Sequence, residues 1–77
     1  MARVQVTEVV AEMVANVLAI SVEVGGDVSI GDTVVLLESM KMEIPVIAEA
    51  AGTVQDIRIA PGDVVQEGDV LVVLTLG

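Results

Sequence analysis

The chain of 77 residues carries twelve acidic and three basic side chains, for a net charge of −9, and contains no histidine, cysteine or aromatic residue. This charge repels phosphates and anionic lipid surfaces, and no apolar run approaches the roughly 20 residues that cross a bilayer, so we expect neither nucleic acid nor a membrane as partner. Without histidine or cysteine we expect no catalytic residue, no metal site and no disulfide. The length predicts one domain, residues 1–77, and the absence of cysteine and of a secretion signal favours the cytoplasm.

The sequence contains an internal repeat. Residues 9–37 align with residues 46–74 at an offset of 37 positions without a gap, and eleven of the 29 pairs are identical. Turn glycines match turn glycines, as Gly31 matches Gly68, and apolar positions match apolar positions. Two copies of one supersecondary unit, related by a pseudo-twofold axis, are therefore predicted.

Each copy has the pattern of β-strands. The first copy alternates at residues 22–24 (VEV) and the second at 57–59 (IRI), and Gly25-Gly26, Gly31-Asp32, Pro61-Gly62 and Gly68-Asp69 are turn formers. Residues 8–20 are compatible with a helix, but the matching segment of the second copy contains Gly52 and alternates like a strand. With valine the dominant apolar residue, we predict an all-β fold: a flattened eight-stranded antiparallel barrel or sandwich of two four-stranded sheets.

Residues 33–38 and 43–49 read as two strands joined by a tight turn at residues 39–42. Tight hairpin turns favour glycine, asparagine or aspartate, and this turn has Met40 and Lys41 instead. A turn that breaks the rule obeyed elsewhere in the chain is a candidate functional site. The repeat also predicts its location: the position 37 residues after Lys41 lies just past the chain end, so the hairpin should lie at the opposite end of the molecule from both termini.

Lys41 is the only lysine of the chain. A lysine amine is mostly protonated at neutral pH, and the sequence offers no base to activate it, so we expect an amine acylated by an external enzyme rather than a nucleophile of the protein's own. The exposed thioethers of Met40 and Met42 suit the pocket of a partner. The alternative is an unmodified β interaction module, in which Lys41 is an ordinary solvated hairpin residue.

The stretch ESMKMEIP (38–45), with GDTVVLLE before it and AGTV and PGDVVQEGDVLVVL after it, resembles the biotinyl domain of biotin-dependent carboxylases, the biotin carboxyl carrier family. The resemblance covers nearly the whole chain and centres on Met40, Lys41 and Met42, with the acid Glu38 shortly before them. Ser39 stands where the family most often has alanine, and the gapless repeat leaves no room for the protruding thumb of some family members.

The resemblance implies a function. A biotin protein ligase would recognise Met40, Met42 and Glu38 and join biotin to Lys41 as an amide. The chain would then carry carboxyl groups between a biotin carboxylase and a carboxyltransferase without catalysing either step. Lipoyl domains share the fold but usually have an acidic residue before the lysine and an apolar one such as alanine after it, so a lipoyl carrier is the other alternative. We expect a monomer.

Overall fold

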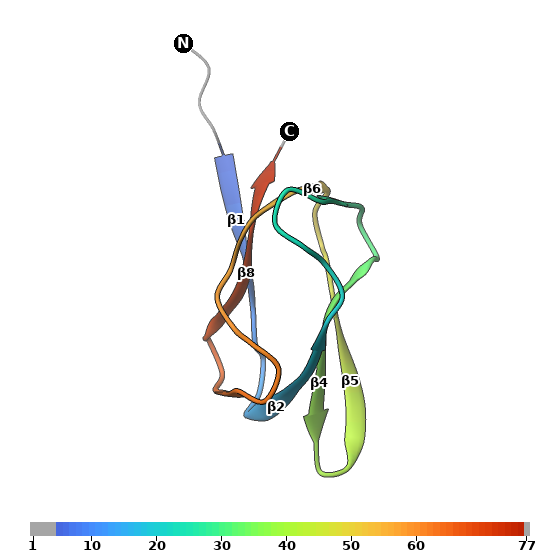
Figure 1. Cartoon of the computed structure of the whole chain (residues 1–77), viewed down its shortest axis with the longest axis vertical. Coiled ribbons are helices and arrows are strands. Elements are labelled where there is room, and N and C mark those ends of the chain that lie inside the picture. Colours follow the sequence, from blue (N-terminus) through green and yellow to red (C-terminus); the bar gives the residue numbers. More distant parts are fainter. Residues whose placement is uncertain (1–4, 77) are drawn as a thin grey trace.

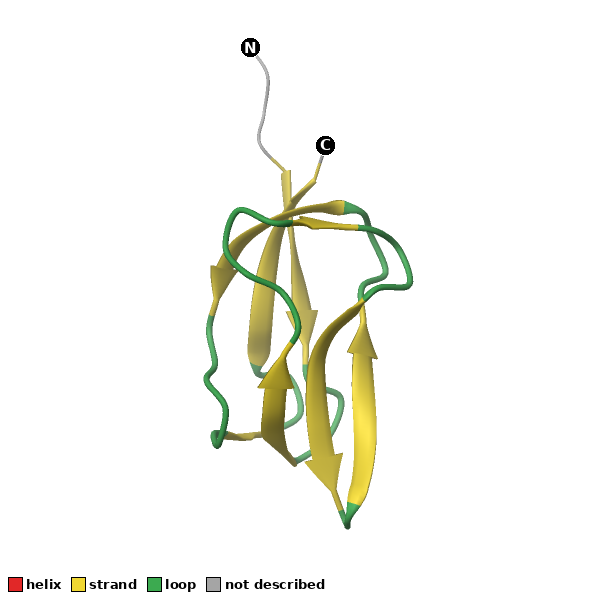
Figure 2. Ribbon diagram, turned by 45° about the vertical axis from the view of Figure 1, so that its right-hand side comes forward, coloured by secondary structure: helices red, strands yellow, loops and turns green. Residues whose placement is uncertain are grey.

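The computed structural model describes residues 5–76, which form eight β-strands and, within that range, no helix (Figures 1 and 2). The strands are β1 (Gln5–Val10), β2 (Ala15–Ile20), β3 (Asp27–Val28), β4 (Thr33–Ser39), β5 (Met42–Ile47), β6 (Gly52–Ile57), β7 (Val64–Val65) and β8 (Val70–Leu76). They make two antiparallel four-stranded sheets, in the orders β1-β8-β6-β3 and β5-β4-β2-β7. The predicted all-β fold is confirmed. No helix able to span a membrane occurs in the part of the chain that the structure describes.

The predicted pseudo-twofold repeat is present strand by strand. Each strand of the first half has a counterpart of equal length 37 residues later, so that β1 matches β5, β2 matches β6, β3 matches β7 and β4 matches β8. We call two residues 37 positions apart twins. Each sheet takes two strands from each half, so the two halves of the chain are interleaved rather than side by side.

The space between the sheets is filled by aliphatic side chains alone. Leu37 and its twin Leu74 are among the most deeply buried residues, together with Val34, Val35, Val54, Val65, Leu71 and Val72. No polar or charged residue is buried among residues 5–76. Each fully buried valine or leucine contributes about 1.5–3 kcal/mol relative to an exposed one, so this core supplies the main driving force for folding.

Turns of one repeated design fasten the two sheets to each other. In the turn at 60–63, Gly62 has the positive φ of 94° that a type II turn requires, and the Asp63 N–H donates to the Ala60 carbonyl at 3.1 Å. The Ala60 N–H in turn donates to Oδ2 of Asp63 at 2.9 Å. Gly62 N–H also donates to the Val17 carbonyl of the other sheet, so the turn links the layers.

Two predicted strands differ in the structure. Residues 22–24 form no strand, and of residues 57–59 only Ile57 belongs to one, at the end of β6. The chain leaves its sheet at these points to cross to the other, where Gly25 N–H donates to the Val54 carbonyl. Val22 stays partly buried. The alternation of apolar and charged residues therefore predicted side-chain burial correctly, but it did not predict whether the backbone pairs with another strand.

The hairpin between β4 and β5 projects from one end of the sandwich (Figure 1). The beginning of β1 and the end of β8 lie at the other end, where Gln5 pairs with Leu76. This is the arrangement that the repeat predicts, with the true chain ends themselves outside the described residues.

Candidate functional site

The hairpin turn contains only two residues. Ser39 pairs with Met42 as the last rung of the β4–β5 ladder, which leaves Met40 and Lys41 to reverse the chain. The predicted four-residue connection is therefore too long by one residue on each side. Met40 has φ of 53° and Lys41 has φ of 65°, the pair of positive values that defines a type I′ turn. The type matches the right-handed twist of the flanking strands.

These are the only residues other than glycine with positive φ among residues 5–76. A left-handed conformation brings Cβ close to the following carbonyl oxygen, and only glycine, and to a lesser degree asparagine and aspartate, adopts it readily. The four other described turns with positive φ use glycine, at Gly25, Gly31, Gly62 and Gly68. The departure from turn chemistry at Met40 and Lys41 is thus a departure in backbone geometry as well as in residue type.

The side chains of the turn point away from the core. Met40 is 92 % exposed, Met42 is 64 % exposed, and Lys41 is exposed between them. Within residues 5–76 the one ion pair joins Arg58 and Asp56, so no carboxylate holds the lysine amine. The amine is free to enter the active site of another protein.

Two carboxylates face each other across the hairpin stem. Glu38 and Glu43 are directly opposed, one rung below the Ser39–Met42 pair. Like charges in this position destabilise a hairpin by about 0.2–1 kcal/mol, so the pair does not serve stability. The rung below it, Leu37 with Ile44, is packed in or against the core and anchors the stem.

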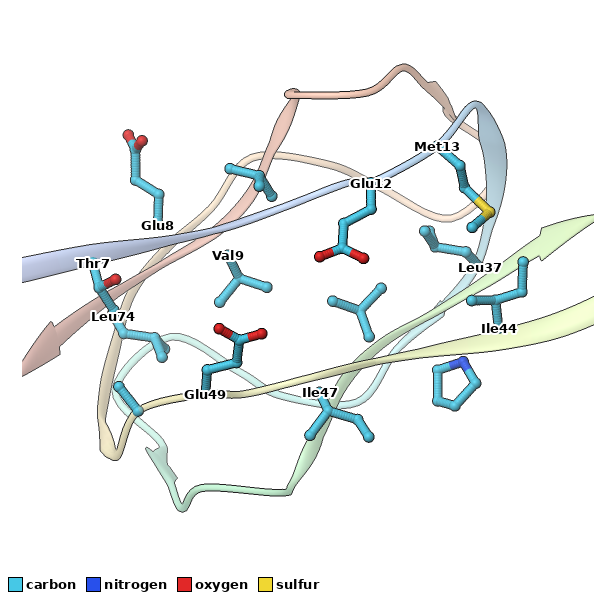
Figure 3. Close-up of a pocket in the computed structure, with 14 residues that line it drawn as sticks. Thr7, Glu8, Val9, Glu12, Met13, Leu37, Ile44, Ile47, Glu49 and Leu74 are labelled. Atoms are coloured by element: carbon cyan, nitrogen blue, oxygen red, sulfur yellow. The ribbon is translucent and has the colours of Figure 1, made fainter.

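A groove of about 440 Å³ runs between the edge strands β1 and β5 (Figure 3). Its fourteen lining residues form seven pairs of twins, among them Leu37 with Leu74 and Glu12 with Glu49. Figure 3 shows Glu12 and Glu49 extending into the groove from opposite sides, each from the segment that follows its edge strand, β1 or β5. The groove lies across the pseudo-twofold axis and is the open seam between the two sheets.

The described residues offer little for catalysis. No group of three or more histidine, cysteine, aspartate or glutamate side chains in residues 5–76 is arranged to hold a metal ion. The aspartates of the turns are engaged with backbone N–H groups, as Asp32 is with Ser29 and Asp69 with Gln66. The chemically distinctive feature is the exposed lysine on a constrained turn.

The hairpin brings together all four residues singled out from the sequence. Met40, Lys41 and Met42 lie at its tip, and Glu38 lies on its stem. Sequence reasoning did not identify the groove, because its presence depends on how far the sheet edges β1 and β5 lie apart. Nor did it single out Met13, which lies at the hairpin end of the groove beside Leu37 and Ile44 (Figure 3).

A rigid β-sandwich that displays one lysine on a strained, exposed turn, without catalytic groups around it, defines a carrier domain. Such a domain holds a covalently attached group for enzymes that act on it. Comparisons with known proteins agree with this class. A family model described as "Biotin-requiring enzyme", for biotin and lipoyl attachment, matches residues 3–74. The chain belongs to this family, and the resemblance found in the sequence is confirmed.

Curated relatives include proteins of similar size. The chain is 50 % identical over 68 residues to the "Biotinylated protein TB7.3 homolog" of Mycobacterium leprae, covering 88 % of this chain and 96 % of the relative. It is 42 % identical over 64 residues to the "Biotin/lipoyl attachment protein" of Bacillus subtilis, covering 83 % and 88 %. A biotin carboxyl carrier protein of Streptococcus mutans is 39 % identical over 64 residues, which are 83 % of this chain and 49 % of that protein.

Solved structures of much larger enzymes contain a similar domain. A single-chain, multi-domain long-chain acyl-CoA carboxylase matches 94 % of this chain with a TM-score of 0.87 and 30 % identity. The urea carboxylase of Kluyveromyces lactis matches 96 % with a TM-score of 0.86 and 30 % identity. The chain spans only 7 % and 6 % of these two proteins, so the likeness concerns their carrier domain and not their catalytic parts.

Proposed function

We propose that the chain is a biotin carrier protein with biotin attached through an amide to Nζ of Lys41. The observation that carries the proposal is the position of the only lysine, on a two-residue turn with both φ values positive and with exposed methionines on either side. The family to which the chain belongs and the biotinylated relatives support biotin as the attached group. We propose that residues 1–77 act as one such domain, as a monomer in the cytoplasm.

The residues of the hairpin fit this role. Lys41 needs only to be reachable, because the enzyme that attaches biotin would supply the base that removes its proton and the activated carboxyl that it attacks. The new bond joins Nζ to the biotin carboxyl carbon as the group that activated this carboxyl leaves with the electrons of its broken bond, and the lysine loses its positive charge with its proton. We propose that a biotin protein ligase recognises Met40, Met42 and Glu38 around the acceptor.

The fixed hairpin then serves as the base of a tether. Attached biotin supplies a ureido nitrogen that can carry a carboxyl group. We propose that the domain moves between a biotin carboxylase and a carboxyltransferase, as the carboxylase neighbours and the carrier-protein relative suggest. The benefit is effective concentration: a tethered cofactor reaches both active sites without free diffusion.

Intact mass spectrometry tests the proposal. The wild-type chain, produced with an active biotin protein ligase, is expected to gain the mass of one biotinyl group, and to bind streptavidin. Lys41→Arg keeps the positive charge and removes the acceptor amine, so it is expected to show neither change. A wild-type chain that stays unmodified under these conditions, or that gains the mass of a lipoyl group instead, would overturn the assignment of biotin.

A further inference from the structure

The pseudo-twofold repeat lets the two ends of the molecule be compared with each other. Both ends are built on the same strands and turns, so an exposed residue that is larger and more apolar than its twin calls for an explanation beyond the shared backbone. The corner between β1 and β2 lies at the hairpin end, and its twin, between β5 and β6, lies at the other end. The two corners differ in sequence although they perform the same turn.

Met13 and Val14 occupy the corner at the hairpin end, and their twins are Ala50 and Ala51. Val14 is 62 % exposed, so most of its added apolar surface faces solvent, whereas Met13 is 39 % exposed and also lines the groove. The fold accepts alanine at both positions of the corner, as the twin corner demonstrates. The larger apolar side chains therefore require another explanation.

Met13 adjoins the lysine hairpin through the groove. Met13 lines the same groove as Ile44, which lies two residues from Met42 on β5. Figure 3 shows Met13 beside Leu37 and Ile44 at that end of the groove. The other end also exposes the apolar residues Val6, Val24 and Ile30.

The size of the hairpin indicates that a partner must contact more than its tip. A specific interface buries about 800 Å² on each partner, whereas Met40, Lys41 and Met42 together can offer roughly 500 Å². The remaining area must come from the hairpin stem, which includes Glu38, and from neighbouring elements, and the corner at Met13 and Val14 adds exposed apolar surface at the hairpin end of the groove.

The length of the unmodified lysine side chain distinguishes one partner from the others. The side chain of unmodified Lys41 extends about 6 Å from its Cα, so an enzyme that acylates Nζ must bring its surface within that distance of the turn. Enzymes that act later do so at the end of an arm about twice as long and need not touch the corner. We propose that Met13 and Val14 extend the docking surface for the biotin-attaching ligase from the hairpin to the β1–β2 corner. This inference rests on the proposed function.

Steady-state kinetics of biotin attachment test it, with the purified unmodified chain as substrate and a biotin protein ligase. The variant Met13→Ala/Val14→Ala carries the residues of the twin corner and is expected to stay folded at the assay temperature, with a somewhat lower Tm because Met13 is partly buried. Its kcat/KM is expected to fall about tenfold, through KM and with kcat nearly unchanged, because the docking contacts are the same in the ground and transition states. The matched control Val24→Ala/Ile30→Ala truncates two exposed apolar residues at the other end and is expected to retain wild-type kinetics.

A second measurement does not depend on turnover of the variant. Lys41→Arg is expected to compete with the wild-type chain for the ligase, and adding Met13→Ala/Val14→Ala to it is expected to raise its inhibition constant about tenfold. The docking inference is wrong, and the proposed function stands, if the wild type is biotinylated, Met13→Ala/Val14→Ala is modified with unchanged kcat/KM, and the same change leaves the inhibition constant of Lys41→Arg unaltered. If the wild type is not biotinylated at all, both fail.

Discussion

The turn at Met40 and Lys41 should make the domain less stable than it would be with residues that adopt positive φ easily. Both residues have positive φ, which a residue with a Cβ adopts at a cost of about 1–2 kcal/mol. Replacing the pair by Asn-Gly, the sequence most favoured in type I′ turns, should relieve much of this strain. Met40 is 92 % exposed, so its removal takes almost no packing from the folded state.

The expected gain is smaller than the strain itself. Glycine at position 41 relieves about 1–2 kcal/mol, but it makes the unfolded chain more flexible, which offsets about 0.5–1 kcal/mol. Asparagine at position 40 adds a further fraction of a kcal/mol to the stability. We expect Met40→Asn/Lys41→Gly to stabilise the domain by about 1–2 kcal/mol, which corresponds to a rise in Tm of about 5–10 °C for a domain of this size.

Thermal unfolding followed by circular dichroism checks this value on the unmodified protein. Lys41→Ala is the matched control, because it removes the same charge as Lys41→Gly but keeps the Cβ and hence the strain. We expect Lys41→Gly to exceed Lys41→Ala in stability by about 1 kcal/mol. Equal Tm values for the two single variants, or an Asn-Gly variant no more stable than the wild type, would refute the view that the turn is strained.

Three further predictions concern a turn, the pairing of β6 with β8, and the net charge. Gly26→Asp should stabilise the domain by about 0.5 kcal/mol, because the carboxylate acceptor that it offers Glu23 N–H, as its twin Asp63 does in the matching turn, outweighs the 3.1 Å approach of the new Cβ to the Glu23 carbonyl oxygen. Gly52→Ala should destabilise it by about 2–3 kcal/mol, because the new Cβ would lie 2.4 Å from the Thr75 carbonyl oxygen. Raising NaCl from about 10 to about 300 mM should raise Tm, because it screens repulsion in a chain of net charge −9.

Urea denaturation measures the first two effects and thermal unfolding the third. Gly26→Ala stiffens the backbone without adding a carboxylate, so it separates this effect from that of the new hydrogen bond. An equal gain in stability from alanine would contradict the role of the carboxylate. Gly52→Ala with wild-type stability would mean that β8 can move away from β6 at little cost. A Tm that does not change with salt would show that the scattered acidic residues repel one another too weakly to affect folding.

The location of the hairpin could be predicted from the sequence because two independent features indicated it. The repeat put Lys41 at the end opposite the chain ends, and the turn rule broken by Met40 marked it as exceptional. The predicted length of the turn was wrong, because the twist of the backbone decides whether Ser39 and Met42 pair with each other or belong to the turn. That twist is a property of the whole ladder and leaves no trace in local residue type.

Other errors have a similar origin. The alternation at residues 22–24 reported which side chains are buried, and it could not reveal that the backbone there crosses between layers. The groove between β1 and β5 depends on how far two sheet edges diverge, which no pattern along one strand encodes. The core was easier to predict, since burial in a two-layer fold follows directly from the position of apolar residues.

Because the two halves are interleaved, the lysine turn has a second role, as the connection between them. Because every sheet combines two strands from each half, neither half could close a core alone, and residues 40–41 are the only covalent connection between them. A chain cut at this turn would be two peptides that can fold only by associating with each other. Lys41, the proposed acceptor, thus lies in the one connection that joins two mutually dependent peptides into one protein.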